Sequence, residues 1–106
     1  MTTVNIEFGI CGFCTTVRAS KTKTMDMEIT IESDCEQITS LGTQIQNMGM
    51  KDVLKTPINK NPVYEKAGKC NLHTSCPVPS GILKAAEAEL GLALKKNVTI
   101  EFQDDE

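Results

Sequence analysis

Strict alternation of apolar and polar residues near the start of the chain limits most strongly what this sequence can fold into. Val4, Ile6, Phe8 and Ile10 are separated by single polar or small residues. A period of two places these four side chains on one face of an extended backbone. Residues 4–10 therefore predict a β-strand with one face buried.

Two further stretches with strand character follow. Residues 15–20 are rich in β-formers, and residues 25–31 alternate again. The polar stretch 20–24 between them predicts the tip of a hairpin that pairs the two strands. Residues 98–102 alternate in the same way and predict a closing strand. The sequence thus predicts three or four short strands, mainly antiparallel.

Two main helices are predicted between and after these strands. Residues 33–36 have the form of a capping box, in which Ser33 and Glu36 each satisfy a backbone amide. The helix that follows ends near Gly49 and buries residues at helical spacing, namely Ile38, Leu41, Ile45 and Met48. The second helix runs from about residue 77 or 80 to residue 90, and Gly91 predicts a Schellman stop.

The stretch between the helices is predicted to hold little regular structure. Residues 51–54 predict a short turn, residues 56–63 a loop rich in Pro and Asn, and residues 64–67 a single helical turn. The predicted fold class is α+β, with a small, mainly antiparallel sheet of three or four strands and two main helices packed on one face. At 106 residues we expect a single domain over residues 1–106.

Composition excludes several classes of function. The net charge of −3 leaves no surplus of Lys and Arg to hold a phosphate backbone, so we expect no nucleic-acid partner. No apolar run approaches the ~20 residues of a membrane span, and the first residues lack the pattern of a signal peptide. We therefore expect a cytoplasmic protein whose thiols stay reduced.

Five cysteines and one histidine carry the chemical signal of this sequence. Cys11 and Cys14 form a Cys-x2-Cys pair in residues 9–14, which predict a strand end or loop flanked by glycines, and Cys35 stands at the predicted start of the first helix. Cys70, His73 and Cys76 are evenly spaced ahead of the last helix. In a reducing compartment clustered cysteines more often bind metal or do redox chemistry than form structural disulfides.

A cysteine at a helix start lies where unpaired amides and the helix dipole favour an anion, so its pKa can fall and yield the thiolate that binds metal. Cys35 and Cys76 are predicted to occupy such positions. Each residue also has a structural alternative. Cys35 can be a buried apolar residue, the Cys-x2-Cys pair can be two small loop residues, and His73 can be an ordinary surface or core histidine.

The order of these parts resembles the iron–sulfur assembly scaffolds of the IscU and NifU N-terminal type. The resemblance rests on Cys11-Gly12, on Cys35 and on Cys76 leading into the Ala-rich residues 82–86. It implies a small antiparallel sheet covered by helices, with Cys11, Cys35 and Cys76 as scaffold cysteines. Two positions differ from that family: Phe13 stands where it usually has aspartate, and His73 lies three residues before Cys76 instead of next to it.

A second resemblance concerns short stretches around the cysteines. Ile10–Cys14 and Cys76–Gly81 are similar to small, uncharacterised cysteine-containing proteins of methanogenic archaea. This resemblance implies a reducing cytoplasm and no particular activity.

Three functions remain open on the sequence. The first is a metal-binding protein that carries an iron–sulfur cluster or Zn²⁺, exchanges it with a donor or acceptor protein, and uses as ligands Cys11, Cys14, Cys35 and Cys76, with Cys70 or His73 as exchange ligands. The second is a thiol–disulfide redox protein that uses Cys11 and Cys14. The third is a non-catalytic structural or interaction module, and a homo-oligomer is compatible with all three. No carboxylate pair, Ser/His/Asp set or phosphate-binding loop indicates an enzyme.

Overall fold

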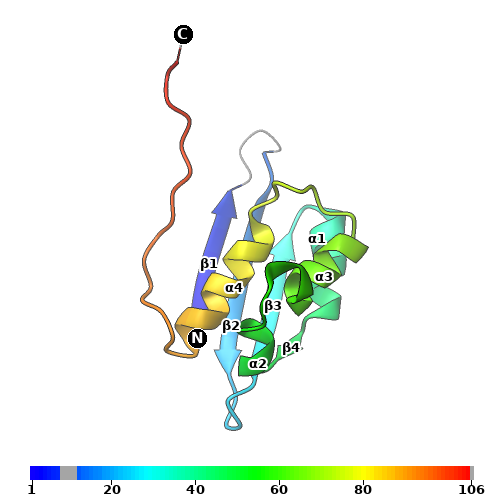
Figure 1. Cartoon of the computed structure of the whole chain (residues 1–106), viewed down its shortest axis with the longest axis vertical. Coiled ribbons are helices and arrows are strands. Elements are labelled where there is room, and N and C mark those ends of the chain that lie inside the picture. Colours follow the sequence, from blue (N-terminus) through cyan, green and yellow to red (C-terminus); the bar gives the residue numbers. More distant parts are fainter. Residues whose placement is uncertain (8–11, 106) are drawn as a thin grey trace.

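Four antiparallel strands form one sheet, and α3 and α4 cover one of its faces (Figure 1). The computed structural model describes residues 1–7 and 12–105. The strands, in the spatial order β1-β2-β3-β4, are β1 (Thr2–Glu7), β2 (Cys14–Lys21), β3 (Met27–Ser33) and β4 (Asn47–Met48). The helices are α1 (Glu36–Gln44), α2 (Met50–Val53), α3 (Pro62–Lys69) and α4 (Val78–Glu89), with a 3₁₀ turn at Ile58–Lys60. The predicted α+β class with a small antiparallel sheet is confirmed.

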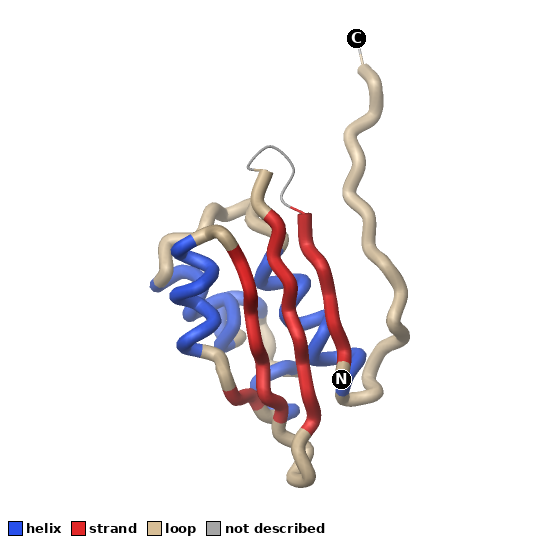
Figure 2. Tube along the Cα trace, turned by 180° about the vertical axis from the view of Figure 1, so that it is seen from behind, coloured by secondary structure: helices blue, strands red, loops and turns tan. Residues whose placement is uncertain are grey.

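Alternation gives the sheet two different faces. The inner residues of β2 and β3 are buried under the helices, among them Val17, Ala19, Met27 and Ile29. Figure 2 views the sheet from its uncovered side, and this open face carries the polar partners of the alternation, such as Arg18 and Glu32, which form an ion pair. The predicted hairpin of β2 and β3 is confirmed by their antiparallel register.

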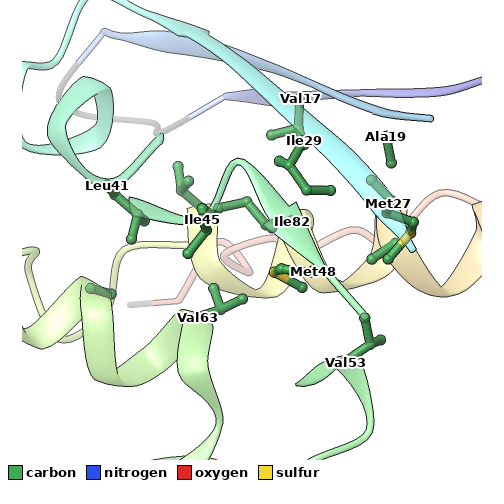
Figure 3. Packing of buried hydrophobic residues seen from close by; sticks show 14 of the residues in the cluster. Val17, Ala19, Met27, Ile29, Leu41, Ile45, Met48, Val53, Val63 and Ile82 are labelled. Carbon is green, nitrogen blue, oxygen red and sulfur yellow. The ribbon is translucent and has the colours of Figure 1, made fainter. Parts of the chain in front are cut away.

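The core lies between this inner face and the helices. Figure 3 shows side chains from the sheet and the helical layer gathered there, including Val17, Ile29, Val63 and Ile82. All four are buried. Burial of apolar area at roughly 25 cal/mol per Å² is the main stabilising term for such a layer.

The capping box predicted at Ser33 is wrong. Ser33 is the last residue of β3, and its Oγ accepts hydrogen bonds from the Thr15 hydroxyl at 2.8 Å and from the Cys35 amide at 3.2 Å. α1 therefore begins only at Glu36, with Cys35 as an extended N-cap whose side chain does not cap the helix. Ser33 is not available as a helix cap because it is part of β3 and its hydroxyl is bonded to the neighbouring strand.

The first helix is also shorter than predicted. Ile38 and Leu41 are buried on α1 as expected, but the helix ends at Gln44. The chain then turns back so that Met48 pairs with Met27 at the edge of β3. Ile45 and Met48 are buried from this return and not from a helix. The four apolar residues at helical spacing are therefore buried from two kinds of backbone, a helix for the first two and a turn followed by a short strand for the last two.

Residues 56–69 are more ordered than predicted. α3 has eight residues in place of a single turn, and Asn61 begins it. The Asn61 Oδ1 accepts from the Val63 amide at 3.0 Å, while its Nδ2 donates to the carbonyls of Asp52, Val53 and Lys55. This buried amide joins the end of α2 to the start of α3.

α4 agrees with its prediction at both ends. Pro77 is the N-cap and Pro79 lies in the first turn, where a missing amide proton costs nothing. At the other end the Leu92 amide donates to the Glu87 carbonyl at 2.9 Å and Gly91 has a φ of +78°. These are the features of a Schellman stop.

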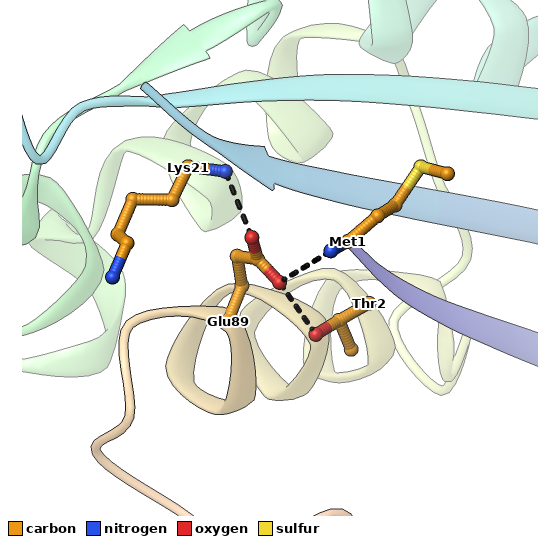
Figure 4. Close-up of polar contacts among 4 residues, drawn as sticks. All are labelled: Met1, Thr2, Lys21 and Glu89. Carbon is orange, nitrogen blue, oxygen red and sulfur yellow. Dashed lines mark hydrogen bonds and ion pairs between the residues drawn. The ribbon is translucent and has the colours of Figure 1, made fainter. Parts of the chain in front are cut away.

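Glu89 fastens the last turn of α4 to the sheet (Figure 4). Its carboxylate accepts from the Lys21 amide at 2.9 Å and from the Thr2 hydroxyl at 2.8 Å, and it pairs with the amino group of Met1 at 3.4 Å. The Lys21 amide first, and the Thr2 hydroxyl next, lower the pKa of Glu89 below its ordinary value. The end of α4 is thereby held against the start of β1 and the end of β2.

The closing strand predicted at residues 98–102 does not form in this chain. Residues 92–105 follow α4 as an extended segment with exposed side chains. Figures 1 and 2 show this segment leaving the body of the molecule on the β1 side of the sheet. The part of the first predicted strand at residues 8–10 lies outside the described residues, while Val4 and Ile6 lie in β1 as predicted.

No helix in the described part of the chain is long and apolar enough to cross a lipid bilayer.

Candidate functional site

Two of the candidate cysteines come to the same end of the sheet through strand pairing. Cys14, the first residue of β2, lies opposite Glu7, the last residue of β1. The next residue, Thr15, lies opposite Ser33 at the end of β3. Cys35 follows Ser33 by two residues and precedes α1. Register alone therefore brings Cys14 and Cys35 to neighbouring strand ends.

Helix packing brings Cys76 to that end as well. Cys76 lies two residues before α4, whose Gly81 packs against the side chain of Ile6 near the end of β1. The other end of α4 is fixed at the start of β1 by Glu89. α4 thus runs antiparallel to β1, and its start lies over the strand ends (Figure 1). We call the region of Cys14, Cys35 and Cys76 the thiol end.

Cys14 is the most accessible of these thiols. It is exposed, and because the neighbouring Thr15 is buried under the helices, alternation turns Cys14 toward the open face of the sheet. Residues 9–14 were predicted to be a strand end or a loop, and Cys14 lies at a strand end, because it is the first residue of β2.

Cys35 is half-buried and packs against the hydrophobic core. Its Sγ donates to the Oε1 of Gln37 at 3.1 Å. The expectation that Cys35 begins a helix is confirmed, since it is the N-cap of α1. Its partial burial also agrees in part with the alternative that Cys35 is a buried apolar residue. Cys35 thus packs against the core and still reaches the surface.

Cys70 makes contacts of a different kind. It ends α3, and its Sγ lies 3.7 Å from the Ser40 Oγ and 3.5 Å from the Gln44 Nε2 on α1. Ser40 follows Cys35 by five residues, or about 7.5 Å along a helix axis. Cys70 therefore docks α3 against the middle of α1, beyond the thiol end.

The segment from Asn71 to Cys76 links α3 to α4. Asn71 takes a left-handed conformation with a φ of +59°, and the amide of Leu72 reaches back to the Ala67 carbonyl at 3.2 Å. This Schellman turn ends α3 after Lys69, beyond the single helical turn predicted at residues 64–67. A second turn then joins the Cys76 amide to the His73 carbonyl at 3.0 Å.

That second turn couples His73 and Cys76 through their backbones. His73 is exposed, whereas Cys76 is half-buried and packs against the core. The prediction that Cys76 lies just before the last helix is confirmed. The three-residue spacing of His73 and Cys76 is thus explained by this turn, which has one of them at each end.

The thiol end does not hold a preassembled cage of ligands among the residues described. Within residues 1–7 and 12–105, no three side chains of His, Cys, Asp or Glu are arranged to hold a metal ion. Cys11, predicted as a fourth ligand, lies outside the described residues. The fold brings these cysteine-bearing segments to one end of the sheet.

Three carboxylates adjoin the described cysteines of the thiol end. Glu7 lies opposite Cys14, and Asp34 and Glu36 flank Cys35, all three exposed. Reactive cysteines usually have electropositive surroundings, whereas carboxylates near sulfur attract cations.

Comparison with protein families matches residues 2–102 to a family of unknown function, DUF6951. The chain belongs to the DUF6951 family. All five cysteines lie within the matched residues, and so does the extended segment up to Phe102. Comparison with curated proteins and with solved structures gave no match.

Membership in DUF6951 confirms the expectation of an uncharacterised family. The resemblance to IscU-type scaffolds and to archaeal proteins stays a prediction. Sequence reasoning missed two contributors to the site in this DUF6951 member. Asn71, as a residue type that tolerates left-handed backbone, was a signal for the end of α3. Gly81, inside a helical pattern, was a signal for close packing on a neighbour.

Proposed function

We propose that this protein binds a thiophilic metal cargo, an iron–sulfur cluster or Zn²⁺, at the thiol end and exchanges it with a donor or acceptor protein. The ligands are Cys14, Cys35 and Cys76, with Cys11 as the fourth predicted from sequence. Thiolates are the ligands that both cargoes prefer. The single observation that carries the proposal is the convergence of three cysteine-bearing segments on one end of the sheet.

Charge around the site supports a cation over an anionic substrate. Glu7, Asp34 and Glu36 adjoin the cysteines. A bound metal ion offsets the mutual repulsion that several thiolates and carboxylates would have at one end of a small domain. The same carboxylates disfavour approach of anionic thiol reagents, so metal binding fits this surface better than thiol exchange does.

A site without three preformed metal ligands among its described residues suits a carrier. A site that closes only when metal arrives couples loading to a local rearrangement, and such a site releases its cargo more readily than a rigid tetrahedral cage. His73 is exposed and shares a turn with Cys76. It is therefore suited to act as an exchange ligand during transfer.

Anaerobic reconstitution with iron and sulfide, and separately with Zn²⁺, tests the proposal. Bound metal and sulfide are measured, together with visible absorption, in the wild-type protein and in four variants, C14S, C35S, C76S and C70S. We expect the wild type to retain cargo and the first three variants to lose most of it. The C70S variant is the matched control, because Cys70 contacts α1 away from the thiol end.

Two results would contradict the proposal. One is a wild-type protein that keeps neither cargo after gel filtration. The other is equal loss of cargo in C70S and in C35S while circular dichroism shows both folded.

The second candidate function is thiol–disulfide exchange at Cys11 and Cys14. One observation favours it: Cys14 is exposed, and an attacking thiol must be accessible. Equilibration in glutathione buffers followed by mass spectrometry of alkylated peptides measures this directly. If no Cys11–Cys14 disulfide forms at any ratio of reduced to oxidised glutathione, the redox function is excluded.

A further inference from the structure

The extended segment after α4 carries an exposed apolar stripe. Val98, Ile100 and Phe102 are 60%, 88% and 102% exposed. They alternate with the polar residues Thr99 and Glu101, so an extended backbone would place all three apolar side chains on one face. Three large apolar side chains in such an arrangement have the pattern of a half-buried strand. Among the described residues, these five are not part of any strand.

A strand edge of matching length is open in the same molecule. β1 is the outermost strand of the sheet, and its six residues pair on one side only. An open edge presents a row of unpaired amides and carbonyls that another strand can join. On the helix-covered face of β1, Val4 is only half-buried although it packs against the core. On the open face, Thr3 and Asn5 are polar and exposed.

The two faces of the segment match the two faces of β1. Apolar Val98, Ile100 and Phe102 would continue the inner face beside Val4 and cover it. Thr99 and Glu101 would continue the polar open face. Cross-strand neighbours of this kind stabilise a sheet by side-chain contact.

Direction decides whose β1 edge is joined. α4 runs antiparallel to β1, and its last residue, Glu89, contacts Thr2 at the start of β1. A segment that leaves α4 there can pass along its own β1 only in the direction of β1, as Figures 1 and 2 show. Pairing within the chain would therefore be parallel, whereas every pairing in this sheet is antiparallel. Parallel pairs are slightly less stable per residue. The β1 edge of a second copy is free of this restriction.

We propose that residues 98–102 of one copy add as an antiparallel strand to the β1 edge of a second copy, and that the two copies exchange these segments reciprocally. Ile100 then lies opposite Val4, Val98 opposite Ile6, and Phe102 opposite Thr2. This register sets Glu101 opposite Thr3, so no like charges face each other across the pair. Reciprocal exchange gives a closed two-fold dimer in which both open β1 edges are covered.

The experiment uses the full chain and two variants with the same added charge. Ile100→Asp places a carboxylate on the apolar face of the segment, and Thr99→Asp places one on its polar face. Both residues lie outside the folded body, so both variants keep the circular dichroism spectrum of the wild type. Sedimentation equilibrium should show a dimer for the wild type and for T99D, and a dissociation constant raised at least about tenfold for I100D.

A mixed sample of differently isotope-labelled copies identifies the partner strand. We expect intermolecular nuclear Overhauser effects between Ile100 of one copy and Val4 of the other. A wild type that stays monomeric across the accessible concentration range overturns the proposal. So do Ile100–Val4 contacts found only within one copy, or equal weakening of the dimer in T99D and I100D.

Discussion

Replacing Gly81 by alanine tests the packing that places α4 on the sheet. A Cβ at this position would overlap the Ile6 Cδ1 and would lie 2.8 Å from the Ile6 Cγ1. Ile6 is 8% exposed and lies beneath the helix, so its side chain has little room to move. The new methyl group therefore forces either Ile6 out of its rotamer or α4 away from β1.

The magnitude follows from two opposing terms. Alanine is preferred over glycine in a helix interior by about 1 kcal/mol. Overpacking a filled core costs about 1–3 kcal/mol. We therefore expect Gly81→Ala to lower the free energy of unfolding by up to about 2 kcal/mol, because the clash outweighs the helical preference.

Gly68→Ala is the matched control. Gly68 is also a helical glycine, in α3, and a Cβ there would meet no atom within 4 Å. Only the backbone term remains, so this variant should gain about 0.5–1 kcal/mol. Urea unfolding monitored by circular dichroism measures both changes. The two substitutions are chemically identical and should differ in sign.

A second substitution isolates the cause. Ile6→Val removes the Cδ1 that the new methyl group meets, and alone it should cost about 0.5–1.5 kcal/mol. In the Gly81→Ala background this cost should shrink or reverse. If Gly81→Ala stabilises the protein as much as Gly68→Ala does, or if the two changes at residues 6 and 81 are additive, the close packing of α4 on β1 is refuted.

Two other predictions concern polar contacts that hold elements together. Glu89→Gln should cost about 1.5–3 kcal/mol at neutral pH, because glutamine offers one acceptor oxygen in place of the two that serve the Lys21 amide and the Thr2 hydroxyl, and it carries no charge to pair with Met1. The folded-state pKa of Glu89 is lowered, so this stability is present above the ordinary carboxyl pKa and is lost as the pH falls through the folded-state value. Urea unfolding should thus show the gap between the wild type and E89Q closing in acid, whereas a pH-independent gap, or an equal one in Glu87→Gln, would contradict this reasoning. Asn61→Ala should cost about 2–4 kcal/mol because a helix cap and several buried carbonyls lose their partner. The midpoint temperature of thermal unfolding, Tm, measures this loss, because 1 kcal/mol shifts Tm by about 5 °C in a domain of this size. A Tm of the variant within about 1 °C of the wild type would show that Asn61 is dispensable.

Patterns carried by neighbouring residues predicted much of the fold. Alternation located β3, a run of β-forming residues located β2, and their hairpin pairing followed from the short polar tip. Pro77 and Gly91 correctly marked the two ends of α4. In each case the signal is local, because an amphipathic strand or a capped helix is recognised by residues within a few positions.

Elements that depend on distant partners were predicted poorly. Ser33 was predicted to cap a helix, but it pairs with Thr15 of β2 and accepts a hydrogen bond from the Thr15 hydroxyl. Met48 fitted a helical spacing, yet it reaches the core through a two-residue strand paired with β3. Residues 98–102 do alternate, but in the described structure they form no strand, because a strand also needs a partner to pair with.

The candidate site shows the same division. The sequence predicted that Cys35 and Cys76 precede helices, and both do. It did not separate Cys70 from them, because only the packing of α3 on α1 turns that thiol toward Ser40 and Gln44. Metal binding itself stays a prediction that rests on residue chemistry.

Residue types and short spacings were enough to predict β1, β2, β3 and α4 and to identify the thiols that carry the chemistry, because these features are local in the chain. Tertiary structure decided which thiols share an end of the molecule. Strand register set Cys14 beside the end of β1, and the contact of Gly81 with Ile6 set the start of α4 above it. The physical reason is that pairing and close packing join residues far apart in the chain, and their energies depend on surfaces that exist only once the chain has folded.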